Sequence, residues 1–322
     1  MKKILYSGNK NIYKANLHNH TTVSDGNLTP EEIKKIYMEK GYSIIAYTDH
    51  DELVSQEHLS DDNFLAIASC EVSISQSSDQ GKILGGGKTY HLNLYATKSG
   101  VTKTPPLPTM DYHDIDAINE YISDRTKEGF LVSYNHPYWS LQTYEDYAPL
   151  KGCFAMEIYN HNCEVDEAYY GYAPQVYDEM LRTNHRLYCL ATDDNHNNAT
   201  PESANYDSFG GWVCINSESL KYEDIMNALE TGDFYSSQGP EIHEIYIEDN
   251  SLNVKCSPCD LIVVYTQSRG CLKAVGKDLT SAKFELPGDE QHIRELFGDD
   301  QYIRIMCRDA FKKDATSNAY WL

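Results

Sequence analysis

The sequence is poor in basic residues and contains no long apolar run. Only 27 Lys and Arg stand against 49 Asp and Glu, which gives a formal net charge of −22. Nucleic-acid polymers and anionic membranes are bound through clustered Lys and Arg, so this charge argues against both as partners. No stretch approaches the roughly 20 apolar residues of a membrane-spanning helix. An anionic small molecule is still compatible with this charge if bound metal ions supply positive charge locally.

Signs of disulfides and of export are also missing. The nine cysteines are an odd number, which fits no complete set of disulfides. The first ten residues hold too few apolar side chains for the core of a signal peptide. We therefore expect a reduced, cytoplasmic protein, and the oligomeric state stays open.

Two short motifs favour ordinary turns over binding sites. Cys256 and Cys259 have the spacing of a zinc knuckle, but no second pair follows at a suitable distance. A turn between strands is expected there. The three glycines at 85–87 lack the strand–helix context of a phosphate-binding loop, so a flexible hairpin is expected.

Short β-type runs alternate with helical patterns through the first 241 residues. The clearest helix start combines Thr29 as N-cap, Pro30 at the first position and Glu32 closing a capping box, and Gly41 ends this helix. The further helices expected are 114–127, 174–184 and 222–230, and the strands expected are 14–18, 43–48, 64–70, 90–96, 130–135, 153–159, 187–192 and 211–215. This alternation predicts an α/β fold with a parallel barrel or a doubly wound sheet.

The pattern changes at residue 242. Strand-like runs at 244–247, 261–266 and 302–306 are separated by turn residues, with one short helix expected at 291–297. We expect two domains, a larger one over 1–241 and a small β-rich one over 242–322.

Most residues of metal-ligating type fall where the expected strands end. His18 and His20 end the first strand, and residues i and i+2 of an extended segment project to the same side. The further candidates are Asp25, His50, Glu71, His91, His136, Asp194 and His196. The carboxyl ends of the strands carry the active site in α/β barrels. Ligands of the His, Asp and Glu types suit zinc, manganese or iron.

The number of candidates indicates more than one ion. Nine ligands are too many for a single cation, and a carboxylate such as Glu71 can bridge two, so we expect two or three divalent ions. Asp193 and Asp194 are adjacent, and either could be the ligand. His161 ends a strand and is a candidate substrate contact, and Asp49 is expected to orient a neighbouring ligand.

This pattern resembles the polymerase-and-histidinol-phosphatase (PHP) superfamily over about 180 residues. The matching motifs are His18-x-His20, Ser24-Asp25-Gly26, Asp49-His50, Glu71, His91, Asn135-His136-Pro137 and Asp194-x-His196. Gly210-Gly211-Trp212 and the segments 231–240 and 316–321 look like the branch of the family with an appended C-terminal β domain.

The resemblance implies a distorted seven-stranded (β/α)7 barrel around a site for two or three metals. One ion would take His18, His20, Glu71 and Asp194; a second would share Glu71 and take His91 and His136; a third would take Asp25, His50 and His196. The Asp-x-His spacing favours Asp194 over Asp193. Asp25 stands where some members have histidine, so the resemblance fixes neither the identity nor the occupancy of the third ion.

We therefore expect a metal-dependent phosphoesterase that hydrolyses a small phosphorylated metabolite or nucleotide with a metal-bridging hydroxide. His161 or His196 is expected to protonate the leaving oxygen. One alternative is hydrolysis of a carbamate, ester or amide on the same metals, and another is a non-catalytic metal-binding regulatory module. Cationic side chains that face the metals would favour phosphate, and the candidates are Lys88, Arg125 and Arg182.

Overall fold

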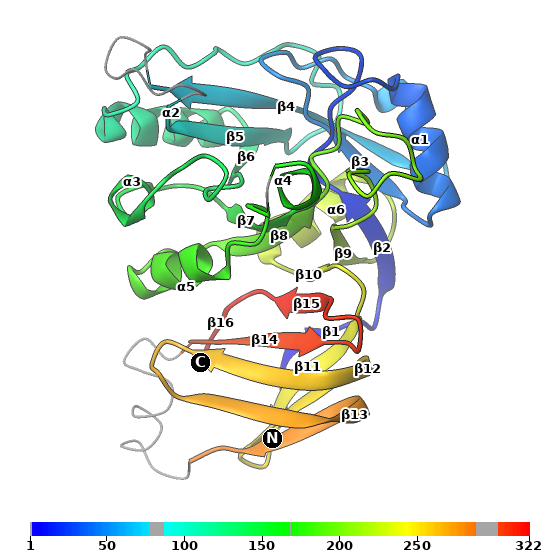
Figure 1. Cartoon of the computed structure of the whole chain (residues 1–322), viewed down its shortest axis with the longest axis vertical. Coiled ribbons are helices and arrows are strands. Elements are labelled where there is room, and N and C mark those ends of the chain that lie inside the picture. Colours follow the sequence, from blue (N-terminus) through cyan, green and yellow to red (C-terminus); the bar gives the residue numbers. More distant parts are fainter. Residues whose placement is uncertain (1, 77–86, 168, 288–301) are drawn as a thin grey trace.

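One large twisted sheet runs through the protein (Figure 1). The structure is a computed structural model that describes residues 2–76, 87–167, 169–287 and 302–322. The helix expected at 291–297 and the first two glycines of the run at 85–87 lie outside the described residues. None of the helices in the described ranges has the length and apolar character needed to cross a membrane.

The helices and strands alternate less regularly than expected. The described helices are α1 (Pro30–Glu39), α2 (Ile115–Lys127), α3 (Tyr144–Tyr147), α4 (His161–Val165), α5 (Pro174–Arg182) and α6 (Tyr222–Thr231), with a 3-10 turn at Glu57–Leu59. The described strands are β1 (Lys3–Ser7), β2 (Asn11–Asn16), β3 (Ile44–Tyr47), β4 (Leu65–Ser75), β5 (Thr89–Ala96), β6 (Phe130–Tyr134), β7 (Ala155–Asn160), β8 (Tyr188–Thr192), β9 (Trp212–Ser217), β10 (Phe234–Ser237), β11 (Ile242–Glu248), β12 (Ser251–Thr266), β13 (Cys271–Glu285), β14 (Tyr302–Arg308), β15 (Asp314–Ser317) and β16 (Tyr320–Trp321).

The start of α1 follows from its capping residues. The Thr29 side chain accepts a hydrogen bond from the backbone N–H of Glu32, and the Glu32 carboxylate accepts one from the backbone N–H of Thr29. These two bonds satisfy two N–H groups that the first turn would otherwise leave free. The capping box expected from the sequence is therefore confirmed.

The sheet brings the carboxyl ends of distant strands together. Strands β2, β3 and β4 are parallel neighbours, as are β6, β7 and β8, while β5 is antiparallel to both β4 and β6. Just beyond β2 and β8, the Asp194 N–H donates to the His18 carbonyl at 2.9 Å, and the His20 N–H donates to the Asn195 carbonyl at 3.1 Å. The mixed α/β class is confirmed, while the distorted seven-stranded (β/α)7 barrel stays a prediction. Antiparallel β5 interrupts the expected alternation of parallel strands and helices.

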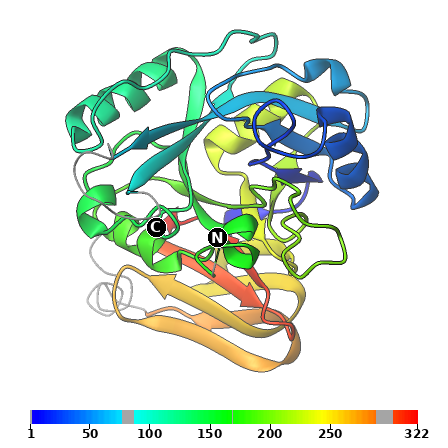
Figure 2. The ribbon, with the colours of Figure 1, turned by 45° about the horizontal axis from the view of Figure 1, so that its top comes forward.

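The last strands form a layer at one end of the molecule. Strands β11 to β14 lie along the same edge in Figure 1 and in the turned view of Figure 2. Their core includes Ile245, Leu252, Val264 and Ile305. Strand β1 pairs with β11, so the N-terminal strand belongs to this layer, and the division between 241 and 242 stays a prediction. The turn expected at 256–259 is wrong, because these residues lie inside β12.

An Arg304→Ala variant should unfold at a lower temperature than the parent. Arg304 on β14 is buried, and its Nε and Nη2 donate to Oδ1 and Oδ2 of Asp178 on α5, each at 2.7 Å. The variant leaves the Asp178 carboxylate without its cation, which costs about 3 kcal/mol for a largely buried pair. Thermal melts measure the effect. The control is Lys127→Ala, which removes the cation of an exposed ion pair with Asp124. Equal midpoints for the two variants would contradict the prediction.

Candidate metal centre

The nine side chains expected to bind metal lie together at one edge of the sheet. Glu71 and His91 lie on β4 and β5, and the others lie in the loops that follow β2, β3, β6 and β8. The nine are His18, His20, Asp25, His50, Glu71, His91, His136, Asp194 and His196. They fall into three overlapping sets, and within each set one ligand atom per residue lies within 4.8 Å of the others.

The first set is fully buried and joins β2, β4 and β8. Nε2 of His18 and Nε2 of His20 lie 3.1 Å and 3.0 Å from Oδ1 of Asp194. The same two nitrogens lie 3.3 Å and 3.4 Å from the two carboxylate oxygens of Glu71. Two imidazoles and two carboxylates therefore point at one position.

The second set shares Glu71 with the first. Oε1 of Glu71 lies 3.1 Å from Nδ1 of His91 and 3.5 Å from Nε2 of His136. Its other oxygen, Oε2, lies 3.2 Å from Nδ1 of His50, which belongs to the third set. Glu71 thus contacts ligand-type side chains of all three sets, each within 3.5 Å.

The third set is more exposed and is organised by a tight turn. Asp25 lies 3.5 Å from Nδ1 of His20, 3.5 Å from Nε2 of His196 and 3.6 Å from Nε2 of His50. A Cβ atom at Gly26 would stand 2.4 Å from the His20 carbonyl oxygen, so only glycine fits the turn that aims Asp25 at the site.

The donor set fits divalent cations. Oδ1 of Asp194 is buried and accepts no hydrogen bond of good geometry. Nε2 of His18 and Nε2 of His20 face each other at 3.2 Å. Buried polar atoms in proteins are normally satisfied, so an orphaned oxygen and two facing imidazole nitrogens favour a cation between them.

Glu157 on β7 is a functional candidate that the sequence analysis missed. Its Oε1 lies 2.6 Å from Nδ1 of His18 and accepts a hydrogen bond from Thr192 Oγ1 at 2.7 Å. Its Oε2 accepts from the His136 backbone N–H at 3.0 Å and from Asn160 Nδ2 at 2.9 Å. A carboxylate behind an imidazole fixes which ring nitrogen faces the metal. The only signal in the sequence is a charged residue inside an otherwise apolar strand.

The structure separates the two adjacent aspartates. Asp194 faces His18 and His20, whereas Asp193 points away and accepts hydrogen bonds from the Tyr37 hydroxyl and from the N–H groups of residues 209–211. Burial raises the pKa of Asp193 to about 6, although the backbone N–H donors oppose this. Asp193 therefore anchors the 209–211 turn.

The three expected catalytic residues lie in different places. Asp49 binds the 21–24 turn, accepting from Thr21 N at 2.8 Å and from Ser24 Oγ at 2.9 Å, so it holds the loop that carries Asp25. His196 lines the cavity as a member of the third set. The structure does not bring His161 to the cavity: its Nδ1 lies 2.8 Å from the Tyr159 hydroxyl.

His161 is fixed in that orientation by close packing. A Cβ atom at Gly210 would stand 2.1 Å from the imidazole ring. Burial lowers the pKa of His161 to about 4, so the ring is neutral near pH 7. The expected substrate contact finds no support in this placement.

A cavity of about 200 Å³ opens over the candidate metal centre. Besides the ligands, it is lined by Trp139, Asn162, Cys163, Asp166, Glu167 and Asn198. Trp139 packs edge-on against His136, with ring centroids 4.9 Å apart. Among the described residues no Lys or Arg lines this cavity.

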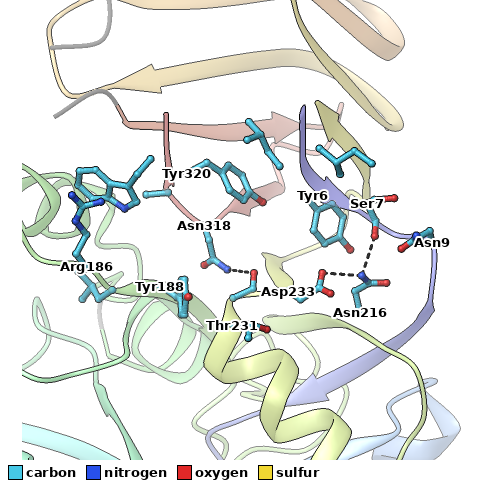
Figure 3. Close-up of a pocket in the computed structure, with 16 residues that line it drawn as sticks. Tyr6, Ser7, Asn9, Arg186, Tyr188, Asn216, Thr231, Asp233, Asn318 and Tyr320 are labelled. Atoms are coloured by element: carbon cyan, nitrogen blue, oxygen red, sulfur yellow. Dashed lines mark hydrogen bonds between the residues drawn. The ribbon is translucent and has the colours of Figure 1, made fainter. Parts of the chain in front are cut away.

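A larger cleft of about 690 Å³ lies elsewhere, between β1, β16 and the end of α6. Figure 3 shows two asparagines in it: Asn318 Nδ2 donates to the Gly232 carbonyl at 3.1 Å, and Asn216 Nδ2 donates to Asp233 Oδ1 at 2.8 Å. None of the nine metal-ligand candidates lines this cleft, and it adds nothing to the site.

Metal binding should weaken as the pH falls. Burial lowers the pKa of His20, but the carboxylates of Asp194 and Glu71 outweigh burial and raise it to about 9. The metal-free protein therefore holds a proton on this imidazole at neutral pH, and a cation must displace it. We expect the apparent Zn²⁺ affinity to fall about tenfold per pH unit below that pKa for each proton displaced. Calorimetry in buffers of different ionisation enthalpy measures the proton release, and an affinity independent of pH would contradict the prediction.

Comparisons with known proteins give distant structural similarities only. No family model matches the chain, and no curated protein matches it. A two-domain Bacteroides vulgatus protein containing a predicted PHP-like metal-dependent phosphoesterase matches 99% of this chain and 97% of its own, with 16% identity and a TM-score of 0.48. A predicted metal-dependent phosphoesterase from Bifidobacterium adolescentis matches 59% of this chain and 90% of its own, with 14% identity and a TM-score of 0.38.

A third similar structure belongs to another class of hydrolase. An amidohydrolase from Chromobacterium violaceum, with sulfate and no metal bound, matches 56% of this chain and 87% of its own, with 14% identity and a TM-score of 0.36. At these identities and TM-scores none of the three carries a functional argument. The function of this chain is therefore inferred from the geometry of its own residues.

Proposed function

We propose that this protein is a metal-dependent hydrolase whose substrate is a small phosphate ester. The observation that carries the proposal is the contact of one buried carboxylate, Glu71, with three sets of ligand-type side chains. Two or three divalent ions, Zn²⁺, Mn²⁺ or Fe²⁺, would be held by the nine residues described above. Such ions supply Lewis acidity and lower the pKa of a coordinated water.

The charge of the ligand set suits a phosphate group. Asp25, Glu71 and Asp194 carry three negative charges, and the six other ligands are neutral when they bind metal. Two divalent ions exceed the charge of these three ligand carboxylates by one, so the cluster of metals and ligands is itself positive and attracts an anion. Asn162 and Asn198 line the cavity and offer neutral hydrogen-bond donors to the phosphoryl oxygens.

A second candidate is hydrolysis of an uncharged carbamate, ester or amide. The three expected phosphate-binding cations are directed elsewhere: Lys88 pairs with Asp146 at 2.5 Å, Arg125 pairs with Glu128 at 2.8 Å, and Arg182 lies exposed on α5. Asp166 and Glu167 line the cavity and would repel an anionic group. These two observations favour a substrate with less negative charge than a phosphomonoester.

A substrate panel decides between the two. The protein would be stripped with a chelator, reloaded separately with Mn²⁺, Zn²⁺ or Fe²⁺, and assayed on phosphomonoesters, phosphodiesters, carboxylesters, carbamates and amides. We expect metal-dependent turnover of a phosphate ester. Turnover of carbon-based substrates alone would establish the second candidate, and no turnover of any class would support a non-catalytic module.

We also propose that the seven strands from β2 to β8 form the distorted seven-stranded barrel that the resemblance implies, with residues 242–322 as a separate unit. The support for the barrel is the pairing of the segments after β2 and β8, through the bridge between Asn19 and Asn195. Limited proteolysis around residue 241, followed by separation of the fragments, tests the domain division.

A further inference from the structure

Three cysteines lie together in the C-terminal layer, away from the candidate metal centre. Cys256 and Cys259 lie on β12, and Cys307 lies on β14. All three are at most 2% exposed, none forms a disulfide, and their sulfur atoms lie within 4.8 Å of one another. The sequence analysis rejected a zinc site because no second Cys pair follows. The third sulfur comes from a strand that the local spacing cannot reveal.

The backbone of β12 is distorted where the cysteines occur. Lys255 pairs with Ser281 and Cys259 pairs with Leu279, so β12 advances by four residues while β13 advances by two. In a regular strand, residues i and i+3 point to opposite faces. The irregularity, which contains Pro258, allows Cys256 and Cys259 to face the same neighbour, as bulges at functional sites do.

We propose that Cys256, Cys259 and Cys307 bind one thiophilic divalent cation, Zn²⁺, which ties β12 to β14. Sulfurs bound to one Zn²⁺ at about 2.3 Å lie roughly 3.8 Å apart in tetrahedral geometry, so the cluster needs only a small contraction. The Leu279 carbonyl oxygen lies 3.8 Å from the Cys256 sulfur. The three cysteines supply three of the four zinc ligands, and the fourth would be a neutral oxygen, from this carbonyl or from water.

Thiolate ligands also explain why this cation would be held in an apolar layer. The cluster belongs to the core that contains Ile242, Val254 and Ile305. Each thiol gives up its proton to solvent when the metal binds, and the cation compensates two of the three negative charges, which this core could not hold without it. A structural zinc site of this kind stabilises the fold and takes no part in the hydrolase reaction.

Cobalt(II) substitution in the full-length protein tests the proposal. Metal-depleted, reduced protein is titrated with Co²⁺ and then with Zn²⁺. We expect a thiolate-to-cobalt charge-transfer absorption whose final intensity corresponds to one cobalt ion per chain and which Zn²⁺ bleaches, because the nine candidate ligands of the other centre include no cysteine. Cys256→Ser and Cys307→Ser should each lose this band and one zinc per chain. Cys163→Ser should keep both, although Cys163 lines the other cavity.

Two further measurements test the proposal even if the Cys256→Ser and Cys307→Ser variants fail to fold. Zn²⁺ should raise the thermal midpoint of the parent and of Cys163→Ser equally, and it should protect three thiols of the parent from alkylation. A parent without the charge-transfer band would overturn the proposal. So would a band that survives in both Cys256→Ser and Cys307→Ser, or a disulfide between any two of the three cysteines in the freshly isolated protein.

Discussion

A Glu71→Gln variant should lose at least one metal ion per chain and about 10² or more of its turnover. The Glu71 carboxylate is buried and lies within 3.3 Å of nitrogens of His18, His50 and His91. Burial raises its pKa, but the surrounding imidazoles outweigh burial and hold the pKa well below the usual range. Gln keeps the shape of the Glu71 side chain and removes its negative charge. Cations bound near this position would then repel each other more strongly, because less negative charge lies between them.

Three measurements on the same preparation check the result for Glu71: metal content, rate on the best substrate of the panel, and thermal midpoint. The exposed carboxylate of Glu241, changed to Gln, serves as the control for charge removal. Parental metal content together with parental rate would contradict the shared role of Glu71. A lowered midpoint with full metal content would assign Glu71 to the stability of the fold alone.

A Glu157→Gln variant should bind metal 10- to 100-fold more weakly, which is the usual effect of removing a carboxylate behind a ligand. Glu157 is buried and accepts from Thr192 and from Asn160, in addition to its contact with His18. Gln offers one acceptor oxygen and an NH₂ group that meets other donors, so at least one hydrogen bond is lost and the His18 ring is free to turn. At a limiting metal concentration, the turnover of Glu157→Gln should fall in parallel with its metal affinity.

Competition with a chromogenic chelator measures the affinity of the Glu157 variant. Thr192→Val removes only one of the hydrogen bonds to Glu157 and is expected to change the affinity by less than Glu157→Gln does. Excess metal should largely restore turnover in Glu157→Gln if the residue acts by positioning His18. Unchanged affinity in this variant would rule out that role.

The approach of Asp25 to His18 and His20 could be predicted because local sequence fixes it. His18 and His20 project to one side of an extended segment, and the Asp25–Gly26 turn returns a carboxylate to the same place. Glu157 could not be predicted in this way, because its role depends on His18, which lies 139 residues away. Nothing next to Glu157 in the chain indicates that partner.

The same distinction between local and distant contacts explains which parts of the fold could be predicted from the sequence. The capping box of α1 is local, and its helix was expected at the right residues. The antiparallel placement of β5 and the approach of Cys307 to β12 arise from packing between distant segments. A pattern of strand and helix lengths carries no information about either.

The pairing of β1 with β11 has a consequence for the synthesis of this protein. Ser7 is paired with Glu244, and Lys3 with Ile247, so β1 can pair only with a strand that is synthesised about 240 residues later. At usual rates of translation that delay is roughly 10–50 s. During this time the edge of β1 and the Tyr6 ring, which the finished protein buries, are open to other nascent chains. Pairing of β1 with β11 therefore comes late in synthesis, after most of the larger region has been made, and until then β1 is exposed to the non-native contacts that chaperones suppress.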